Sequence, residues 1–85
     1  MHPVDVDERR LMIVNVSGEL YAADRICTHE EADLSTGFLM GSVVTCPLHL
    51  SRFDVTSGEV QNAPASAPLK TYSLKVEGTS VYVHL

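Results

Sequence analysis

Two short pairs of metal-binding side chains constrain this chain more than any other feature. Cys27 and His29 are separated by one residue and, after sixteen further residues, Cys46 and His49 are separated by two. Both cysteines of the chain and two of its four histidines fall in these pairs. Each pair joins a thiolate donor to an imidazole, a donor set typical of sites that hold an iron–sulfur cluster or zinc. The pattern predicts that all four residues bind one metal centre.

The two pairs leave alternatives to an iron–sulfur cluster open at this point. Zinc also accepts two sulfurs and two nitrogens, so a redox-silent, zinc-stabilised binding module is one alternative. A zinc finger usually keeps its cysteines in one pair and its histidines in the other, whereas here the pairs are mixed. A disulfide between Cys27 and Cys46 would leave the paired histidines unexplained. His2 and His84 lie outside the pattern, and we expect both to be solvated.

The rest of the chain is patterned as short strands and turns. Runs rich in β-favouring residues are separated by turn signals, and the last two runs alternate apolar with polar side chains around a short hairpin turn. No segment sustains a helical period over three turns. The expected fold class is therefore all-β, a small antiparallel sandwich or partly open barrel. The expected strands are residues 11–16, 19–23, 43–45, 71–76 and 80–85.

Several stretches resemble the Rieske family, whose 2Fe-2S cluster has two cysteines on one iron and two histidines on the other. The spacing C-x-H-x16-C-x-x-H is similar to that of the family. Residues 34–37 resemble its L-S-x-G turn, and residues 52–58 resemble its R-F-D-x-x-x-G stretch. Residues 63–69 resemble its proline-rich third loop. The segment 69–85 is similar to the closing hairpin of the soluble ferredoxins of bacterial aromatic-ring dioxygenase systems, so the resemblance covers nearly the whole chain.

The resemblance implies a single Rieske domain over residues 1–85, built from three stacked antiparallel sheets. A cluster-binding subdomain, about residues 27–53, is inserted in it, and residues 63–69 form a cover loop. The cysteine-bound iron would be buried and the histidine-bound iron would lie near solvent, so electrons would leave through the imidazoles. The implied ligands of one 2Fe-2S cluster are Cys27, His29, Cys46 and His49.

Four other positions compare this chain with the subgroups of the family, and the first two resemble the soluble, lower-potential ferredoxins. Ala32 and Leu48 stand where respiratory and photosynthetic members place two cysteines that form a disulfide between the cluster loops. Ser51 matches a serine that donates a hydrogen bond to a cluster sulfide in those members, although a turn residue also bonds its own backbone. Phe53 replaces their tyrosine. Because each such donor raises the potential, we expect this site in the lower part of the Rieske range of roughly −150 to +300 mV.

The implied function is one-electron transfer from a flavin-dependent NAD(P)H reductase to a terminal, ring-hydroxylating oxygenase. The sequence offers no nucleophile with an evident base and no open metal site, so the chain is not expected to be an enzyme itself. A small subunit of a nitrite-reductase-like enzyme is an alternative within the same family.

Composition limits the partners and the location. A chain of 85 residues forms one domain with a modest core, which a cluster would help to stabilise. A net charge of −5 argues against nucleic acid or an anionic membrane as partner. No apolar run approaches the ~20 residues that cross a bilayer, and no secretory signal opens the chain. With both cysteines assigned as ligands, nothing indicates an oxidising compartment, and we expect a cytoplasmic protein.

Acidic residues gather near the start of the chain and around the first pair, either as an ordinary solvated face or as a docking rim for basic redox partners. These acidic residues are Asp5, Asp7, Glu8, Asp24, Glu30, Glu31 and Asp33. A second group of residues is expected to pack under the loops and not to form a binding surface. This group is Leu34, Phe38, Leu39 and Met40.

The start of the sequence departs from the family pattern. Members usually have a further strand and turn ahead of the position of Pro3, so that strand is expected to be missing here. An open sheet edge is a site for pairing with another chain. We therefore expect weak stability without the cluster and a weak homodimer through the open edge.

Overall fold

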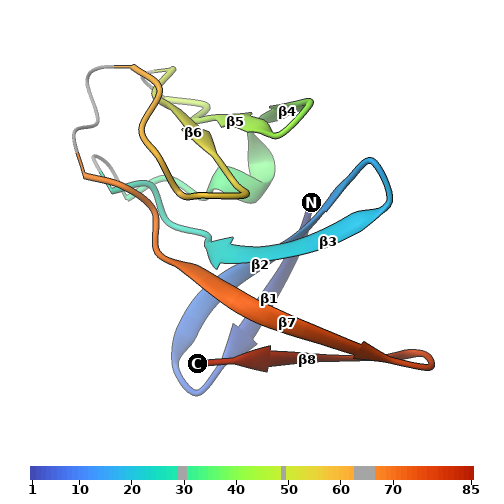
Figure 1. The fold of residues 1–85 in the computed structure, drawn as a ribbon. Helices are drawn as coiled ribbons and strands as arrows, with labels where there is room; N and C mark the ends of the chain where they lie inside the picture. The colour runs from blue at the N-terminus through green and yellow to red at the C-terminus, as the bar shows by residue number, and fades with distance from the viewer. Residues whose placement is uncertain (29–30, 49, 63–66) are drawn as a thin grey trace.

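The computed structural model describes residues 1–28, 31–48, 50–62 and 67–85 (Figure 1). Within these ranges the chain forms eight strands and one short 3-10 helix, η1 (Leu34–Thr36), so the expected all-β fold class is confirmed. The strands are β1 (His2–Val6), β2 (Arg9–Val16), β3 (Glu19–Asp24), β4 (Phe38–Met40), β5 (Val43–Thr45), β6 (Arg52–Asp54), β7 (Thr71–Glu77) and β8 (Ser80–His84).

The larger sheet has the strand order β1-β2-β3-β7-β8, and all of its pairs are antiparallel. β1, β2 and β3 form a meander, and β7 and β8 form the expected closing hairpin. The meander and the hairpin meet in only two residue pairs, Ala22 with Tyr72 and Ala23 with Thr71. This short ladder explains a difference from the expected three sheets, because it joins two of them into one hydrogen-bonded sheet.

The smaller sheet, β4-β5-β6, lies across from the larger one and holds the second cysteine at the end of β5 (Figure 1). Its register places Leu39, Val44 and Phe53 side by side across the three strands. Val44 and Phe53 are fully buried in the same core as Met12 of β2. The core therefore joins the two sheets and fixes the base from which the cysteine loops extend.

One expectation about side-chain packing is half wrong. Leu34 is buried and Leu39 packs against the core, as expected. Phe38 and Met40, however, are 69% and 83% exposed. Successive side chains of a strand point to opposite faces of the sheet. Leu39 lies beside Val44 on the face that packs against the core, so Phe38 and Met40, its two neighbours, lie on the opposite face toward solvent.

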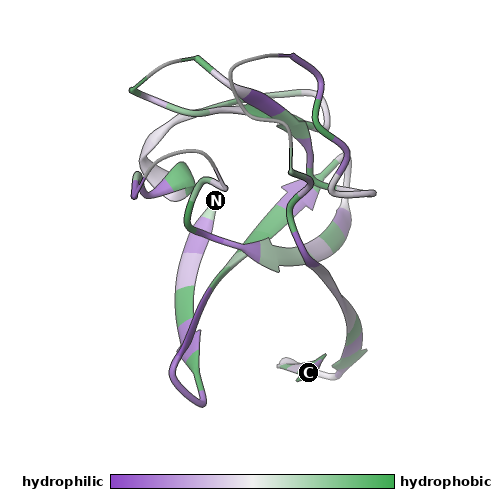
Figure 2. Ribbon diagram, turned by 90° about the vertical axis from the view of Figure 1, so that its left-hand side faces the viewer, coloured by the Kyte–Doolittle hydropathy of each residue, from purple (hydrophilic) through white to green (hydrophobic). Residues whose placement is uncertain are grey.

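The outer strands of the larger sheet are β1 and β8, each with one neighbouring strand in the described part of the chain. An apolar groove of about 400 Å³ lies against both strands. Val4 and Val6 line it from β1, and residues 81–83 line it from β8. Hydrophobic and hydrophilic bands alternate along β1 (Figure 2), which is why one side of that strand contributes the apolar wall.

Candidate metal centre

The two predicted sulfur ligands are buried in one cluster of residues. Cys27 and Cys46 are 5% and 0% exposed, belong to the same core and are not joined in a disulfide. The predicted imidazole ligands, His29 and His49, lie outside the described residues. The structure therefore brings together the thiol half of the predicted site. His84, excluded from the ligand set, is exposed on β8 as expected.

Both cysteine loops are closed in the same way. The Cys27 amide donates to the Ala32 carbonyl at 2.9 Å, and the Cys46 amide donates to the Ser51 carbonyl at 2.7 Å. In each case the bond spans five positions, with the cysteine at the base of the loop and one predicted histidine within it. Each loop therefore starts from a buried thiol and contains one predicted imidazole, as a centre with one sulfur and one imidazole from each loop requires.

A buried arginine holds the base of the first loop. The Arg25 carbonyl accepts from the Leu34 amide at 2.7 Å, while its guanidinium Nη1 donates to the Leu11 carbonyl at 3.3 Å. Nη2 bonds Asp5 Oδ1 at 2.9 Å, and Nε lies 3.3 Å from Asp33 Oδ2 without hydrogen-bond geometry. Arg25 thus ties the loop of Cys27 to β1 and β2.

The L-S-T-G stretch positions one loop against the other. Asp33 Oδ1 accepts from the Ser35 amide at 2.9 Å and caps η1. Gly37 follows η1, and a Cβ there would collide with the Thr45 carbonyl oxygen. Since Thr45 directly precedes Cys46, this close approach requires glycine and sets the spacing between the two loops.

The R-F-D stretch after the second loop ends in a side-chain network. Asp54 Oδ1 accepts from the hydroxyl and the amide of Thr56 at 2.6 and 2.9 Å, and Oδ2 accepts from the Ser42 hydroxyl at 3.3 Å. The pKa of Asp54 lies below its ordinary value. The hydrogen bond from the Thr56 hydroxyl is the largest cause and the bond from the Thr56 amide is the second, while burial acts in the opposite direction. The ionised carboxylate therefore fastens β6 to the β4–β5 turn.

The glycine of the same stretch brings the third loop close to the second. Gly58 has a φ of +82°, and a Cβ there would collide with the Leu69 carbonyl oxygen. The Leu69 amide donates back to the Gly58 carbonyl at 2.8 Å. At the described end of this loop, the Thr28 hydroxyl donates to the Ala67 carbonyl at 2.7 Å. Residues 63–66, the centre of the predicted cover loop, lie outside the described residues.

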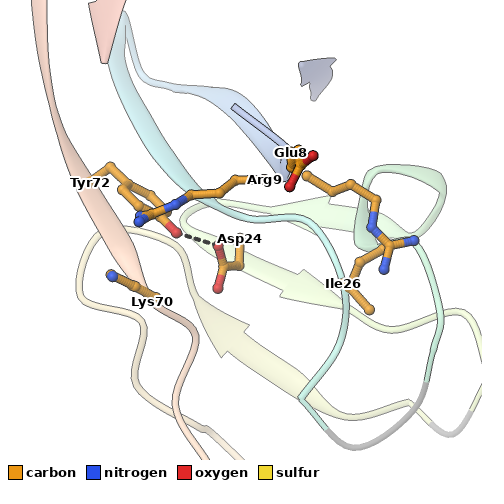
Figure 3. A pocket seen from close by; sticks show the side chains of 7 residues that line it. Glu8, Arg9, Asp24, Ile26, Lys70 and Tyr72 are labelled. Atoms are coloured by element: carbon orange, nitrogen blue, oxygen red, sulfur yellow. Dashed lines mark hydrogen bonds between the residues drawn. The ribbon is translucent and has the colours of Figure 1, made fainter. Parts of the chain in front are cut away.

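A polar cleft of about 410 Å³ beside the first loop was not predicted (Figure 3). The Tyr72 hydroxyl donates to Asp24 Oδ1 at 2.6 Å, and Arg9 and Lys70 lie over the Tyr72 ring at 5.9 and 5.5 Å from its centroid. Burial, and then the hydrogen bond to Asp24, raises the pKa of Tyr72 above its ordinary value. No short motif predicts this cleft, because its side chains come from β2, β3 and β7 and from three separate segments beside these strands.

These contacts narrow the predicted acidic rim. Asp24 bonds Tyr72, and Asp5 and Asp33 face Arg25, so these three carboxylates have structural roles. Glu30 lies outside the described residues. Asp7, Glu8 and Glu31 are exposed and complete the predicted set. Asp7, Glu8 and Glu31 are thus the described acidic residues of this set that are exposed and have no structural role assigned above, while Asp5 is also exposed but pairs with Arg25.

The donor set agrees with a cluster that takes two thiolates from the protein interior. Cys27 and Cys46 are buried among apolar side chains, and the resemblance supplies the other two ligands as the undescribed histidines. When bound, a 2Fe-2S group takes up and releases one electron. Cys27 and Cys46 would be two of the residues that hold this group.

Comparisons with known proteins agree with this arrangement. The family model described as the Rieske 2Fe-2S domain matches residues 1–73. The ferredoxin component of the naphthalene 1,2-dioxygenase system of Pseudomonas aeruginosa is 45% identical over 82 residues, covering 96% of this chain and 79% of that protein.

Solved structures share the fold. A chain in the complex of reduced oxygenase and oxidized ferredoxin in carbazole 1,9a-dioxygenase superposes with a TM-score of 0.92 and 34% identity, over 98% of this chain and 86% of that one. The ferredoxin of carbazole 1,9a-dioxygenase from Nocardioides aromaticivorans IC177 gives 0.90 and 36%, over 95% and 80%. In the part of this chain that the structure describes, no helix has the length and hydropathy to cross a membrane.

Proposed function

The chain belongs to the Rieske 2Fe-2S family, and we propose that it carries single electrons from a flavin-dependent NAD(P)H reductase to a terminal ring-hydroxylating oxygenase. It is an electron carrier of the ferredoxin type, as are the ferredoxin components to which it is similar, and not itself the catalyst. The observation that carries the proposal is the pair of equal loops closed on buried Cys27 and Cys46.

The proposed ligands are Cys27 and Cys46 for one iron and His29 and His49 for the other. The burial of both thiols supports this division, since a sulfur-bound iron in the interior leaves the imidazole side to meet partners. Leu48 and Leu50, which flank His49 in the sequence, are more than half exposed. We propose that they surround the exit for the electron with apolar surface, which excludes water when a partner docks.

The first experiment is chemical analysis and spectroscopy of the purified protein. We expect iron and inorganic sulfide in equal amounts, and a red-brown colour that dithionite bleaches. Zinc in place of iron would contradict the electron-carrier proposal and favour the redox-silent, zinc-stabilised binding module. For the ligands, His49→Ala should lose the cluster or its reducibility, while His84→Ala, on exposed β8, should keep both. A normal reducible cluster in His49→Ala would contradict the ligand assignment.

The two proposed partners, the oxygenase and the reductase, are supported by different observations. A relative's structure contains an oxygenase together with a ferredoxin, which supports the proposed oxygenase partner; the reductase is inferred from the chemistry of electron supply. We propose that exposed Asp7, Glu8 and Glu31 attract basic partner surfaces. Electron-transfer rates should then fall as ionic strength rises. Rates that do not depend on salt concentration would contradict a role of these acidic residues in docking. We also propose a cytoplasmic location, because both cysteines are assigned to the cluster.

A weak homodimer through the open sheet edge also remains a proposal. The apolar groove between β1 and β8 supports it, because two strand edges and an apolar floor favour the addition of a strand. Light scattering over a range of concentrations should show growing average mass. Val81→Lys should suppress this growth by placing a charge in the groove. A constant monomer mass at all concentrations would exclude the dimer.

A further inference from the structure

The side chain of Asn62 bridges two backbone groups of the second cysteine loop. Its Oδ1 accepts from the Arg52 amide at 2.7 Å, and its Nδ2 donates to the Leu50 carbonyl at 3.3 Å. These two groups lie on either side of Ser51. Asn62 therefore fixes the peptide unit before Ser51 and the peptide unit after it, from a segment outside the loop.

The backbone that Asn62 holds is strained. Leu50 has a φ of 60°, in the left-handed region where a side chain with a Cβ is disfavoured by roughly 1–2 kcal/mol per residue. Two bonds hold it there: its amide donates to the Cys46 carbonyl at 3.2 Å, and its carbonyl accepts from Asn62. A strained conformation persists when its surroundings fix it, and such positions gather at functional sites. Leu50 directly follows the proposed ligand His49.

We propose that Asn62 is a positioning residue that sets the redox potential of the cluster by fixing the orientation of Ser51; this inference rests on the proposed function. Ser51 is fully buried, and its carbonyl accepts from the amide of the proposed ligand Cys46. A trans peptide holds its C=O and N–H on opposite sides, so a bond to the Leu50 carbonyl also fixes the direction of the Ser51 amide. Hydrogen bonds from a cluster loop to the sulfurs tune the potential.

Asn62 acts here where no covalent link ties the loops together. Ala32 and Leu48 leave no cysteines for a disulfide between them. The backbone amide of Gln61 donates to the Arg52 carbonyl at 2.7 Å, so the 61–62 segment runs beside the start of β6. From there it reaches the loop with the Asn62 side chain. Asn62 thus holds the second cysteine loop, which contains the proposed ligands Cys46 and His49, through hydrogen bonds and not through a covalent link.

The test compares Asn62→Ala with Gln61→Ala in the cluster-loaded protein. Gln61 is the matched control, because its side-chain amide bonds the Glu59 carbonyl and leaves the loop untouched. In Asn62→Ala we expect the ratio of reduced to oxidised cluster at a fixed potential to fall about threefold, or about 28 mV at 59 mV per tenfold change. The g-values of the reduced cluster should shift with it. Gln61→Ala should match the parent in both.

The strain at Leu50 supplies a second variant. Glycine adopts the left-handed region freely, so Leu50→Gly should keep the loop conformation without the help of Asn62. We expect Asn62→Ala to change the potential much less in a Leu50→Gly background than in the parent, a coupling that a double-mutant cycle measures. This comparison still decides the question if Asn62→Ala alone retains no cluster, since the Leu50→Gly background should then restore it.

The outcomes separate this inference from the proposed function. A parent protein without iron, sulfide and a reducible spectrum would overturn both. A normal parent spectrum with an unchanged potential and unchanged g-values in Asn62→Ala would overturn the role of Asn62 alone. Equal shifts in Asn62→Ala and Gln61→Ala would also overturn it, as would the same Asn62→Ala effect with and without Leu50→Gly.

Discussion

The hydroxyl of Tyr72 donates a 2.6 Å hydrogen bond to Asp24, at the one place where the two parts of the larger described sheet meet. β3 and β7 share two residue pairs there, and the Asp24 amide also donates to the Lys70 carbonyl at 2.9 Å. A short ladder supplies few backbone bonds, so the side-chain bond has a large share in holding the closing hairpin to the meander.

Replacing Tyr72 with phenylalanine should therefore lower stability. Loss of one hydrogen bond from a half-buried hydroxyl costs about 1 kcal/mol of unfolding free energy. Denaturant unfolding of the cluster-loaded protein measures it. Tyr82→Phe is the matched control, because Tyr82 is exposed on β8 and its change should stay within about 0.5 kcal/mol. Equal losses in the two variants would mean that the Asp24 contact adds no specific stability.

Alkaline pH should weaken the same junction. Burial and the bond to Asp24 raise the pKa of Tyr72, so the folded state favours the neutral phenol. This stabilisation is complete below the ordinary pKa of 10.0 and is lost as pH rises from there through the raised value. Unfolding free energy should fall more steeply above pH 10.0 in the parent than in Tyr72→Phe. Parallel curves would contradict the assignment.

Much of the fold follows from local sequence patterns, and the misses have physical causes. The strands with β-branched runs or a flanking turn signal, such as β2 and the β7–β8 hairpin, were predicted within two residues. β1, β4 and β6 were not among the predicted strands. β4 has three residues and none of them is β-branched, whereas the equally short β5, with the sequence Val-Val-Thr, was predicted. The register of β4 with Val44 decides which of its side chains are buried. The same register explains why Phe38 was wrongly expected to be buried.

The cysteines of the candidate site could be predicted from the sequence, but the residues that position its loops could not. The spacing of Cys27 and Cys46 predicted two related loops, and the structure buries both thiols in one core. Asn62 could not be found in this way, because its role depends on a loop ten residues away and on the strained φ of Leu50. The Tyr72 cleft is also invisible in sequence, since side chains from distant strands create it. The histidine half of the ligand set stays a prediction.

Alanine at Gly58 should disrupt the approach of the third loop. Its φ of +82° disfavours a Cβ, and that Cβ would also collide with the Leu69 carbonyl, which is backbone and has little room to move. We expect a loss of about 2 kcal/mol or more in unfolding free energy. Gly18→Ala is the matched control: its φ of +91° carries the same conformational penalty, but nothing lies within 4 Å of the added Cβ. If both variants lose equally, the collision is irrelevant and conformation alone matters.

Acid should release the network around Asp54. Its pKa is lowered first by the Thr56 hydroxyl, so the folded state favours the carboxylate. The resulting stability is present above the ordinary pKa of 3.8 and is lost as pH falls through the lowered value. In an NMR titration, Thr56→Val should move the pKa of Asp54 back toward its ordinary value. Ser57→Ala is the control: it keeps the backbone hydrogen bond from residue 57 and should leave the pKa of Asp54 unchanged. If Thr56→Val also left this pKa unchanged, other contacts would be responsible for stabilising the carboxylate.

The two carboxylates that face Arg25 should contribute unequally to stability. The Asp5 side chain is 72% exposed, so its ion pair is screened by water and Asp5→Ala should cost less than about 0.5 kcal/mol. Asp33 is 38% exposed and also caps η1 through the Ser35 amide. Asp33→Ala should therefore cost about 1–2 kcal/mol, the usual range for a lost cap.

Asparagine at position 33 separates the two contributions of this aspartate. Asp33→Asn keeps an oxygen to accept from the Ser35 amide but removes the charge that faces Arg25. If capping dominates, Asp33→Asn should recover most of the stability that Asp33→Ala loses, in denaturant unfolding of both variants. If Asp33→Asn is as unstable as Asp33→Ala, the charge beside the buried guanidinium contributes more stability than the cap. In that case the first cysteine loop is held chiefly by electrostatics, and its stability should fall as salt is added.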